Sequence, residues 1–329
     1  MTQTSTPARA SARSVLVTGA SGLVGQRVVA RLAAEPDAVS GIVALDLREP
    51  ASEDRRAGVV YEGGDIRDPA LAETLARHRV DTVVHLAAVV TPGPESSRDI
   101  EYSIDVDGTR NVAESCARAG VSQLVYTSSG AAYGYHADNP VPLRESDPLR
   151  GNEAFAYAWH KRLAEEILAE CGAAHPELAV LVFRVGTILG ERVASPITAL
   201  FERPLVVGVA GSDAPFVLIW DEDVAACIVR GIFERRSGTF NLAGDGALAL
   251  PEIARRLGKP YLPLPAPLLA AALRALRALR ISSRGAEQVD FLRYRPVLSN
   301  DALKCDFGFR PRFTSSECFD HYRRLRFGD

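Results

Sequence analysis

The chain has 329 residues, of which 24% are charged, and its formal net charge is −3. This length is sufficient for a large core, either in one large domain or in a domain with a smaller lobe. Because acids and bases nearly balance, the sequence gives no sign of the basic face that binds nucleic acid, so a nucleic-acid partner is not expected.

Cysteine and histidine usage argues against disulfide bonds and metal sites. The five cysteines are scattered, odd in number and never spaced as C-x-x-C, and the six histidines are dispersed. We therefore predict a protein of the reducing cytoplasm with no metal. The first fourteen residues, MTQTSTPARASARS, lack the apolar segment of a secretory signal, so residues 1–14 are expected to form a disordered tail. No integral membrane segment is expected.

Beyond this tail, short apolar runs alternate with helical segments. The runs SVLVTGA, GIVALDL, DTVVHLAA, QLVYTSS and LAVLVFRVG are expected to be strands, and the segments between them helices. Strands that alternate with helices form a parallel sheet. After Gly186 proline and glycine interrupt the pattern, although TFNLAG near Thr239 again resembles a sheet strand.

Three glycines, Gly19, Gly22 and Gly25, lie between the first apolar run and the first helix, in VLVTGASGLVGQRVVARL. A tight turn, a close approach of the backbone to a pyrophosphate and close packing of helix on strand each exclude a Cβ atom. The N-terminus of the helix then binds the phosphate charge. The motif predicts a dinucleotide cofactor.

The pattern as a whole predicts the α/β class, with a Rossmann-type doubly wound parallel sheet and a smaller C-terminal lobe. The cofactor-binding domain is expected over residues 15–186. Residues 187–329 are expected to form mainly a substrate-binding lobe, and segments near 216–243 are expected to return to the first domain.

The choice between the two common dinucleotides depends on the end of the second predicted strand. Asp46 in VALDLRE follows the glycines by about twenty residues, where a carboxylate bonds the ribose hydroxyls of NAD and repels the extra phosphate of NADP. Arg48 lies two residues later and can accept that phosphate. We expect NAD, with NADP possible.

A tyrosine and a lysine stand four residues apart in Tyr157-Ala-Trp-His-Lys161, at the start of a predicted helix. Residues with this spacing lie on one face of a helix, so the phenol and the ammonium can reach a single point. The spacing is suited to catalysis, but a pattern with two fixed letters also arises by chance and needs support from the rest of the chain.

These motifs together resemble the extended short-chain dehydrogenase/reductase family, over nearly the whole chain. TGASGLVG is similar to the family's TGxxGxxG turn, and YAWHK falls where the family carries YxxxK. YTSSGAAYG resembles the segment that supplies the catalytic serine of sugar-nucleotide epimerases, which implies Ser129. The resemblance thus implies a catalytic triad of Ser129, Tyr157 and Lys161.

The resemblance also implies the cofactor contacts. GDIRD is similar to the family's adenine-binding segment, and HLAA to the segment that lines the cofactor. The predicted cofactor-binding residues are Gly19, Gly22, Leu23, Val24, Gly25, Asp46, Arg48, Asp65, Ile66, Leu86, Ala87, Ala88, Tyr157 and Lys161.

The chemistry of hydride transfer gives each triad member a role. An alcohol carbon loses a hydride only as its hydroxyl proton is removed, and a phenol with a pKa near about 10 is a poor base at neutral pH. We predict that the charge of Lys161, together with the oxidised nicotinamide ring, lowers the pKa of Tyr157 toward the working range and that Ser129 holds the substrate oxygen.

Several reactions are consistent with this triad. Family dehydratases carry acidic residues after the serine or threonine, whereas Gly130 and Ala131 follow here, so dehydration is disfavoured. A nucleotide-sugar 4-epimerase-like activity is the first expectation. The alternative is an NAD(P)-dependent dehydrogenase/reductase of a lipophilic hydroxy or keto substrate, and a non-catalytic dinucleotide-binding sensor is a third.

Two departures from the nucleotide-sugar enzymes stand out. Thr187 in RVGTILG occupies the position of an asparagine that helps bind the nucleotide diphosphate in RPxNVYG, and we assign it, with Ser129, to the substrate site. Asp105 in IDVDGT occupies the position of an asparagine in NVxGT, where it affects hydrogen bonding near the active-site helix.

Two helical regions bear on partners. The helices that follow Asp105 and precede Cys171 pair across a two-fold axis in the resembling family, which implies a homodimer. The segment PLLAAALRALRALR, from about Leu268 to Arg280, places leucines on one side and arginines in a basic stripe, and is too short to span a bilayer. A packing helix is the commonest role for such a segment, with an interfacial helix or a substrate lid as alternatives.

Overall fold

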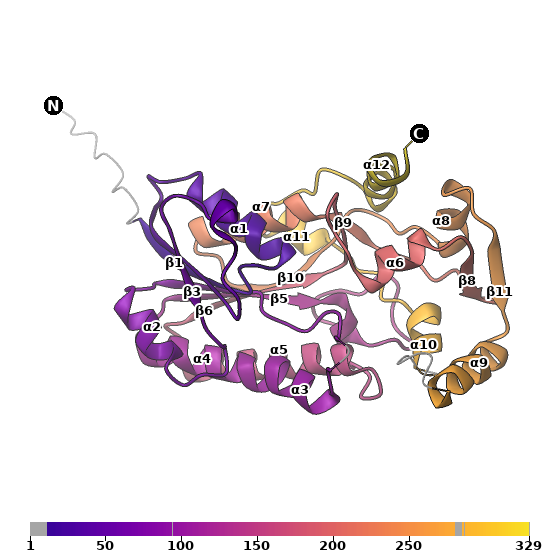
Figure 1. Cartoon of the computed structure of the whole chain (residues 1–329), viewed down its shortest axis with the longest axis horizontal. Helices are drawn as coiled ribbons and strands as arrows, with labels where there is room; N and C mark the ends of the chain where they lie inside the picture. Colours follow the sequence, from indigo (N-terminus) through magenta and orange to yellow (C-terminus); the bar gives the residue numbers. More distant parts are fainter. Residues whose placement is uncertain (1–11, 94, 280–284, 286, 329) are drawn as a thin grey trace.

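One seven-stranded sheet forms the centre of the computed structural model, which describes residues 12–93, 95–279, 285 and 287–328 (Figure 1). Every strand is parallel to its neighbours, in the order β10-β6-β5-β4-β1-β2-β3. Since the connections run outward from β1 in both directions, the sheet is doubly wound, which confirms the predicted fold class. The strands are β1 (Arg13–Thr18), β2 (Val39–Asp46), β3 (Val59–Gly63), β4 (Thr82–His85), β5 (Gln123–Ser129), β6 (Ala179–Val185) and β10 (Gly238–Leu242).

The first strand begins earlier than expected. Arg13 and Ser14 belong to β1, so the prediction of a tail through residue 14 was wrong at its end, and residues 1–11 lie outside the described residues. The backbone N–H of Arg13 donates to Ala38 O at 2.9 Å, and that of Ser14 donates to Asp81 Oδ2 at 2.8 Å. Backbone hydrogen bonds extend β1 beyond its apolar residues. The apolar run was the only feature of the sequence that predicted this strand.

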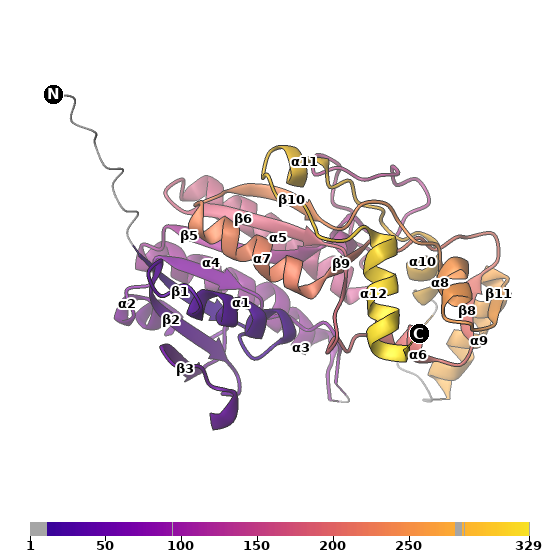
Figure 2. The ribbon, with the colours of Figure 1, turned by 90° about the horizontal axis from the view of Figure 1, so that it is seen from above.

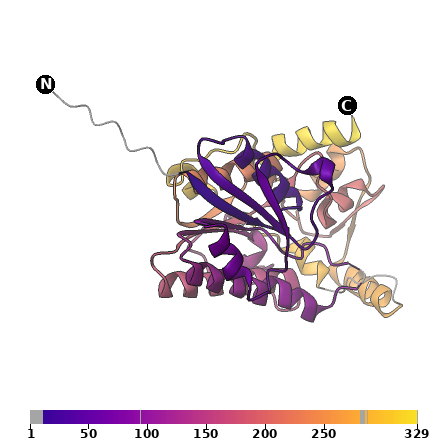
Figure 3. The same cartoon turned by 60° about the vertical axis from the view of Figure 1, so that its left-hand side comes forward.

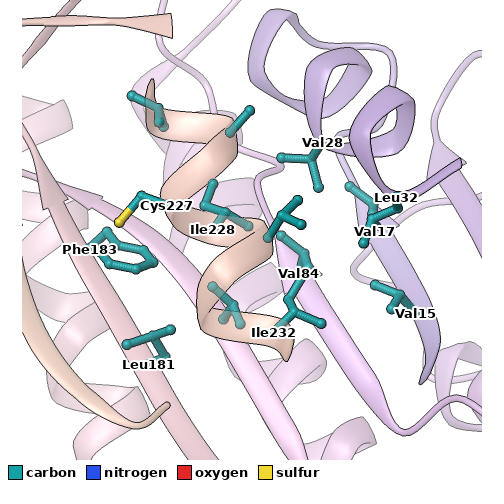
Figure 4. Packing of buried hydrophobic residues seen from close by; sticks show 14 of the residues in the cluster. Val15, Val17, Val28, Leu32, Val84, Leu181, Phe183, Cys227, Ile228 and Ile232 are labelled. Atoms are coloured by element: carbon teal, nitrogen blue, oxygen red, sulfur yellow. The ribbon is translucent and has the colours of Figure 1, made fainter. Parts of the chain in front are cut away.

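Helices α1 (Leu23–Ala33) and α7 (Asp221–Phe233) cover one face of the sheet, and they pack against each other. Buried aliphatic residues recur at helical spacing, for example Val28 and Leu32 on α1 and Ile228 and Ile232 on α7. They meet strand residues such as Val17 in one continuous apolar cluster (Figure 4). The short helix α11 (Asp301–Cys305) adds Leu303 to this cluster.

The opposite face is covered by α2 (Leu71–Arg77), α4 (Gly108–Ala119) and α5 (Ala156–Ala174), as Figures 1 and 3 show. Helix α4 packs between the other two. A short helix, α3 (Arg98–Tyr102), and a π-helical turn, η2 (Ser103–Asp107), lead into α4 and contact α5. The remaining short turns are η1 (Ser52–Asp54) and η3 (Gly130–Tyr133).

The C-terminal lobe lies beside the carboxyl end of the sheet (Figure 2). Two small parallel pairs form in this part of the chain: β8 (Val206–Val209) with β11 (Tyr261–Leu264), and β7 (Thr187–Leu189) with β9 (Leu218–Trp220). Aromatic residues including Phe201, Phe216 and Phe319 form its core. The helices around it are α6 (Pro196–Glu202), α8 (Leu250–Arg256), α9 (Ala266–Ala278), α10 (Gln288–Arg293) and α12 (Ser315–Phe327).

The predicted leucine and arginine helix is α9. Leu269 is buried and packs with Val209 and Val289, and Leu273 is partly buried beside them, so this face of α9 is a packing surface. Leu268 and Leu276 remain exposed, and Arg280 lies outside the described residues. Among the described residues, no helix is long and apolar enough to cross a membrane.

Candidate active site

The predicted site residues gather at the carboxyl edge of the sheet. Strands β1, β2, β4 and β5 end there in Thr18, Asp46, His85 and Ser129. Parallel strands bring their carboxyl ends to one edge, and connections at the point where the strand order reverses leave a crevice beside it. The loops that follow these strands carry the sequence motifs.

The glycine turn between β1 and α1 fits a dinucleotide. Gly19 has φ +67°, and a Cβ atom there would lie 2.7 Å from Ala87 N. A Cβ atom on Gly25 would lie 2.2 Å from Gly19 O, so the turn closes only without side chains. Gly22 caps α1, whose first residues, Leu23 and Val24, carry backbone N–H groups at the helix N-terminus.

Asp46 and Arg48 lie at the end of β2, close to this turn. Asp46 Oδ2 accepts a hydrogen bond from the backbone N–H of Ser21 at 2.9 Å, and Ser21 Oγ donates to Arg48 O at 3.0 Å. The carboxylate is therefore held against the glycine turn, where a ribose is expected. The side chain of Arg48 is exposed.

The two other segments predicted to bind the cofactor, GDIRD and HLAA, lie at the ends of β3 and β4. Asp65 forms an ion pair with Arg67 at 2.6 Å, and this hydrogen bonding lowers the pKa of the Asp65 carboxyl. Ile66 is buried and lies where a Cβ atom on Gly108 would meet it. The partly buried residues Leu86, Ala87 and Ala88 directly follow β4.

The structure brings the predicted triad together. Ser129 ends β5, and its Oγ accepts a hydrogen bond from the N–H of Ala131 at 3.1 Å. Tyr157 lies in the first turn of α5, and the Ser129 side chain acts to lower the pKa of its phenol. Lys161 is buried, and its Nζ donates to Thr127 O at 2.8 Å and to the hydroxyl of Tyr126 at 3.0 Å.

Burial dominates the pKa values of Tyr157 and Lys161 in this structure. Burial raises the pKa of Tyr157 to about 12, and the Ser129 side chain opposes this only in part. The Lys161 ammonium donates to β5 instead, and its Nζ lies 5.9 Å from the Tyr157 ring centroid. Burial also lowers the pKa of Lys161, to about 8. Desolvation is the largest cause of both shifts.

A buried histidine that sequence reasoning missed lies behind the triad. His85 Nδ1 is 2.8 Å from Thr18 Oγ1, and its Nε2 is 3.1 Å from Thr109 Oγ1. Burial, reinforced by the charge of Lys161, lowers the pKa of His85 to about 3. A neutral imidazole therefore ties β1, β4 and α4 together under the site.

Thr187, the predicted substrate residue, contacts an arginine that the sequence did not single out. Arg295 Nη2 donates to Thr187 Oγ1 at 3.1 Å. The guanidinium lies between two rings, 3.9 Å from the centroid of Phe216 and 4.6 Å from that of Phe291. Its Nε and Nη1 atoms are buried without a partner among the described residues, and burial lowers the pKa of Arg295 to about 10.

An aromatic cluster connects this arginine to the catalytic helix. Phe291 on α10 stacks on Phe155 with ring centroids 5.5 Å apart, and both rings meet Tyr135 edge-on at 5.2 Å. Tyr157 packs in the same cluster. A cavity of about 830 Å³ is lined by Ala154, in the loop before α5, and by residues of α9 and α10, among them Arg293. No motif in the sequence marks these aromatic residues, which come from three distant segments.

Solved structures share this architecture across nearly the whole chain. The Bordetella bronchiseptica enzyme WbmG, in complex with NAD and UDP, is 19% identical with a TM-score of 0.73, over 98% of this chain and 97% of that chain. The Thermus thermophilus UDP-glucose 4-epimerase in complex with NAD is 23% identical with a TM-score of 0.70, over 94% of this chain and 99% of that chain.

Curated relatives give two kinds of match. The uncharacterized protein Rv0501 of Mycobacterium tuberculosis is 29% identical over 95% of this chain and 84% of its own length. A UDP-glucose 4-epimerase of Erwinia amylovora is 31% identical, but the match covers 52% of each chain. This second match therefore spans about half of the epimerase.

A family model described as the NAD dependent epimerase/dehydratase family matches residues 15–227, well over half of the chain. The matched region contains the glycine turn, the strand ends and all three predicted triad residues. The match confirms the predictions of an NAD cofactor and of an enzyme of the extended short-chain type. The chain therefore belongs to the NAD dependent epimerase/dehydratase family.

Proposed function

We propose that this protein is a nucleotide-sugar 4-epimerase-like enzyme that acts on a secondary alcohol or ketone through Ser129, Tyr157 and Lys161. NAD, when bound, supplies the hydride acceptor and donor. The glycine turn, Asp46 and the segments after β3 and β4 would hold it. The protein is proposed to act in the cytoplasm, in keeping with its scattered cysteines.

The triad residues divide the proton chemistry among them. Tyr157 removes the substrate hydroxyl proton as a carbonyl forms, and it returns that proton when the carbonyl is reduced from the other face. Ser129 donates a hydrogen bond to the same oxygen. The charge of Lys161 stabilises the phenolate, with an effect that grows as the crevice is closed to water.

The observation that carries the nucleotide-sugar proposal is the environment of Arg295. Two of its buried nitrogen atoms have no partner among the described residues, and a buried N–H donor without an acceptor is costly. Guanidinium groups bind phosphate oxygens in a bidentate manner. A diphosphate beside Thr187 would satisfy these donors, and the aromatic cluster would then place the sugar toward Tyr157. The names of the similar proteins agree with this class of substrate.

A second function is favoured by the aromatic cluster itself. Tyr135, Phe155 and Phe291 present ring surface next to Tyr157, which suits a lipophilic hydroxy or keto substrate. Such an enzyme would be a dehydrogenase/reductase, and it would not depend on an anion at Arg295.

The triad is tested by Tyr157→Phe, which removes one oxygen and keeps the ring. We expect turnover to fall at least about a hundredfold, the scale of general acid–base catalysis, with NAD affinity and melting temperature retained. Activity is followed by NADH absorbance and, separately, by chromatography of UDP-glucose and UDP-galactose, because an epimerase shows no net reduction. Tyr322→Phe is the matched control, since its buried hydroxyl has no partner among the described residues and lies in the lobe core. Full activity of Tyr157→Phe would exclude this mechanism.

Cofactor choice is tested at Asp46. We expect NAD to bind at least about tenfold more tightly than NADP, because the carboxylate repels the additional phosphate. Asp46→Asn keeps an acceptor for the Ser21 N–H and should reduce this preference, as measured by fluorescence titration with each dinucleotide. Equal affinities in the unaltered protein would show that Arg48 dominates, in which case Arg48→Ala should weaken NADP selectively.

The substrate class is tested by Arg295→Met, which keeps an apolar chain between the two rings. We expect the affinity for UDP, measured by calorimetry in the presence of NAD, to fall about tenfold to a hundredfold, with NAD affinity unchanged. Arg236→Met is the matched control, since that guanidinium also stacks on a ring, Phe307 at 5.2 Å, but belongs to the opposite edge of the sheet. Undetectable UDP binding by the unaltered protein would favour the lipophilic substrate.

The protein is proposed to be a homodimer. Helices α4 and α5 pack side by side on one face of the sheet, and the same helices pair across a two-fold axis in the resembling family. Light scattering at micromolar concentration is expected to give twice the chain mass of 35.4 kDa. A single species of 35.4 kDa would overturn the proposal.

A further inference from the structure

Helix α9 packs on the C-terminal lobe with only one of its faces. Leu269 on that face is buried against β8 and α10. On the outward face, the side chains of Leu268, Leu276 and Leu279 are 56%, 37% and 69% exposed. Leu279 caps the helix, and its N–H donates to Ala275 O at 3.0 Å. No other helix in the described part of the chain carries three exposed large apolar side chains, even when its cap residues are included.

The spacing of these leucines makes the outward face of α9 continuous. Successive residues of a helix turn by about 100°, so Leu268 and Leu279 project within about 20° of each other, and Leu276 lies about 80° from Leu268. The other exposed residues on this face are Ala271, Ala272 and Ala275. A contiguous exposed apolar face of this kind indicates an interaction surface.

The charges on α9 are positive. Arg274 and Arg277 are exposed, and they are the only ionisable residues from position 266 to position 279. Arg274 projects about 120° from Leu268, at the border of the apolar face, and forms no ion pair among the described residues. Arg277 lies 3.9 Å from Glu287 and is 64% exposed, so this ion pair is weak. Both guanidinium groups are therefore available to an external anion.

The position and size of α9 indicate what covers its outward face. The helix lies at the outer end of the lobe, away from the seven-stranded sheet (Figures 1 and 2). Its 13 residues give a surface about 20 Å long and about 10 Å wide, far less than the roughly 800 Å² that each partner buries in a stable protein interface. A second copy of the chain is therefore a poor occupant. A lipid surface needs no matched area, and leucines bordered by arginine suit the interface of an anionic bilayer.

We propose that the outward face of α9 docks on an anionic membrane surface. Leu268, Leu276 and Leu279 enter the boundary between headgroups and acyl chains, and Arg274 and Arg277 lie against lipid phosphates. With 13 residues α9 is too short to span a bilayer, so the contact is made at one surface. It is compatible with the proposed location, because the cytoplasmic leaflet carries anionic lipids.

The test is flotation of the full chain with vesicles. We expect binding to vesicles of equal parts phosphatidylglycerol and phosphatidylcholine, and at least about tenfold weaker binding to pure phosphatidylcholine. The double variant Leu276→Gln, Leu279→Gln should weaken binding to the anionic vesicles at least about tenfold, because two apolar side chains no longer leave water. Leu325→Gln is the matched control and should change nothing, since this leucine is also exposed and has an arginine on each side in the sequence but belongs to α12.

A second double variant tests the charges. Arg274→Gln with Arg277→Gln should weaken binding to the anionic vesicles about tenfold and make the remainder less sensitive to salt. Melting temperature identifies any misfolded variant.

Three results would overturn the proposal: no flotation with anionic vesicles, equal affinity for both kinds of vesicle, or full binding by the folded double leucine variant. If that variant instead loses the dimer mass in light scattering while the unaltered protein does not float, the face belongs to a second copy. These outcomes are separate from the proposed function, because UDP binding and turnover are measured without vesicles.

Discussion

The docking of α5 on the carboxyl end of β5 is the constraint on which the site depends. Lys161 on α5 is buried and reaches Thr127 O and the hydroxyl of Tyr126, both on β5. One turn later, Glu165 is buried and bonded to Ser128 Oγ and to Arg184 on β6. Buried charges tolerate few alternative positions, because each must retain its partners. Helix α5 is thereby held in one register, with Tyr157 facing Ser129.

This docking explains why the triad and the cofactor turn share one edge of the sheet. Strands β1, β4 and β5 are adjacent and parallel, so the glycine turn, the HLAA segment and Ser129 follow their carboxyl ends in order. The first turns of helix α5 contact the carboxyl end of β5. The same desolvation that acts on Lys161 raises the pKa of Tyr157 and lowers that of Lys161.

The C-terminal lobe brings Arg295 and its aromatic neighbours to the candidate site. Arg295 and Phe291 reach the catalytic helix through the aromatic cluster, and Thr187 binds the same guanidinium. Phe216, from the loop before β9, closes the other side of Arg295. In the proposed function, substrate recognition therefore depends on how the lobe packs against the sheet.

The sequence by itself determined the parallel sheet, the glycine turn, Asp46 and the Tyr157–Lys161 spacing, because each is written in local patterns of apolar residues, glycines and helical periodicity. It also pointed to Ser129 and Thr187 through family motifs. Only the tertiary structure decided the partners: Arg295 for Thr187, His160 for Asp105, and β5 for Lys161. It also showed that burial dominates the pKa of Tyr157. Burial and contact between distant segments set these properties, and neither has a signature in a short stretch of sequence.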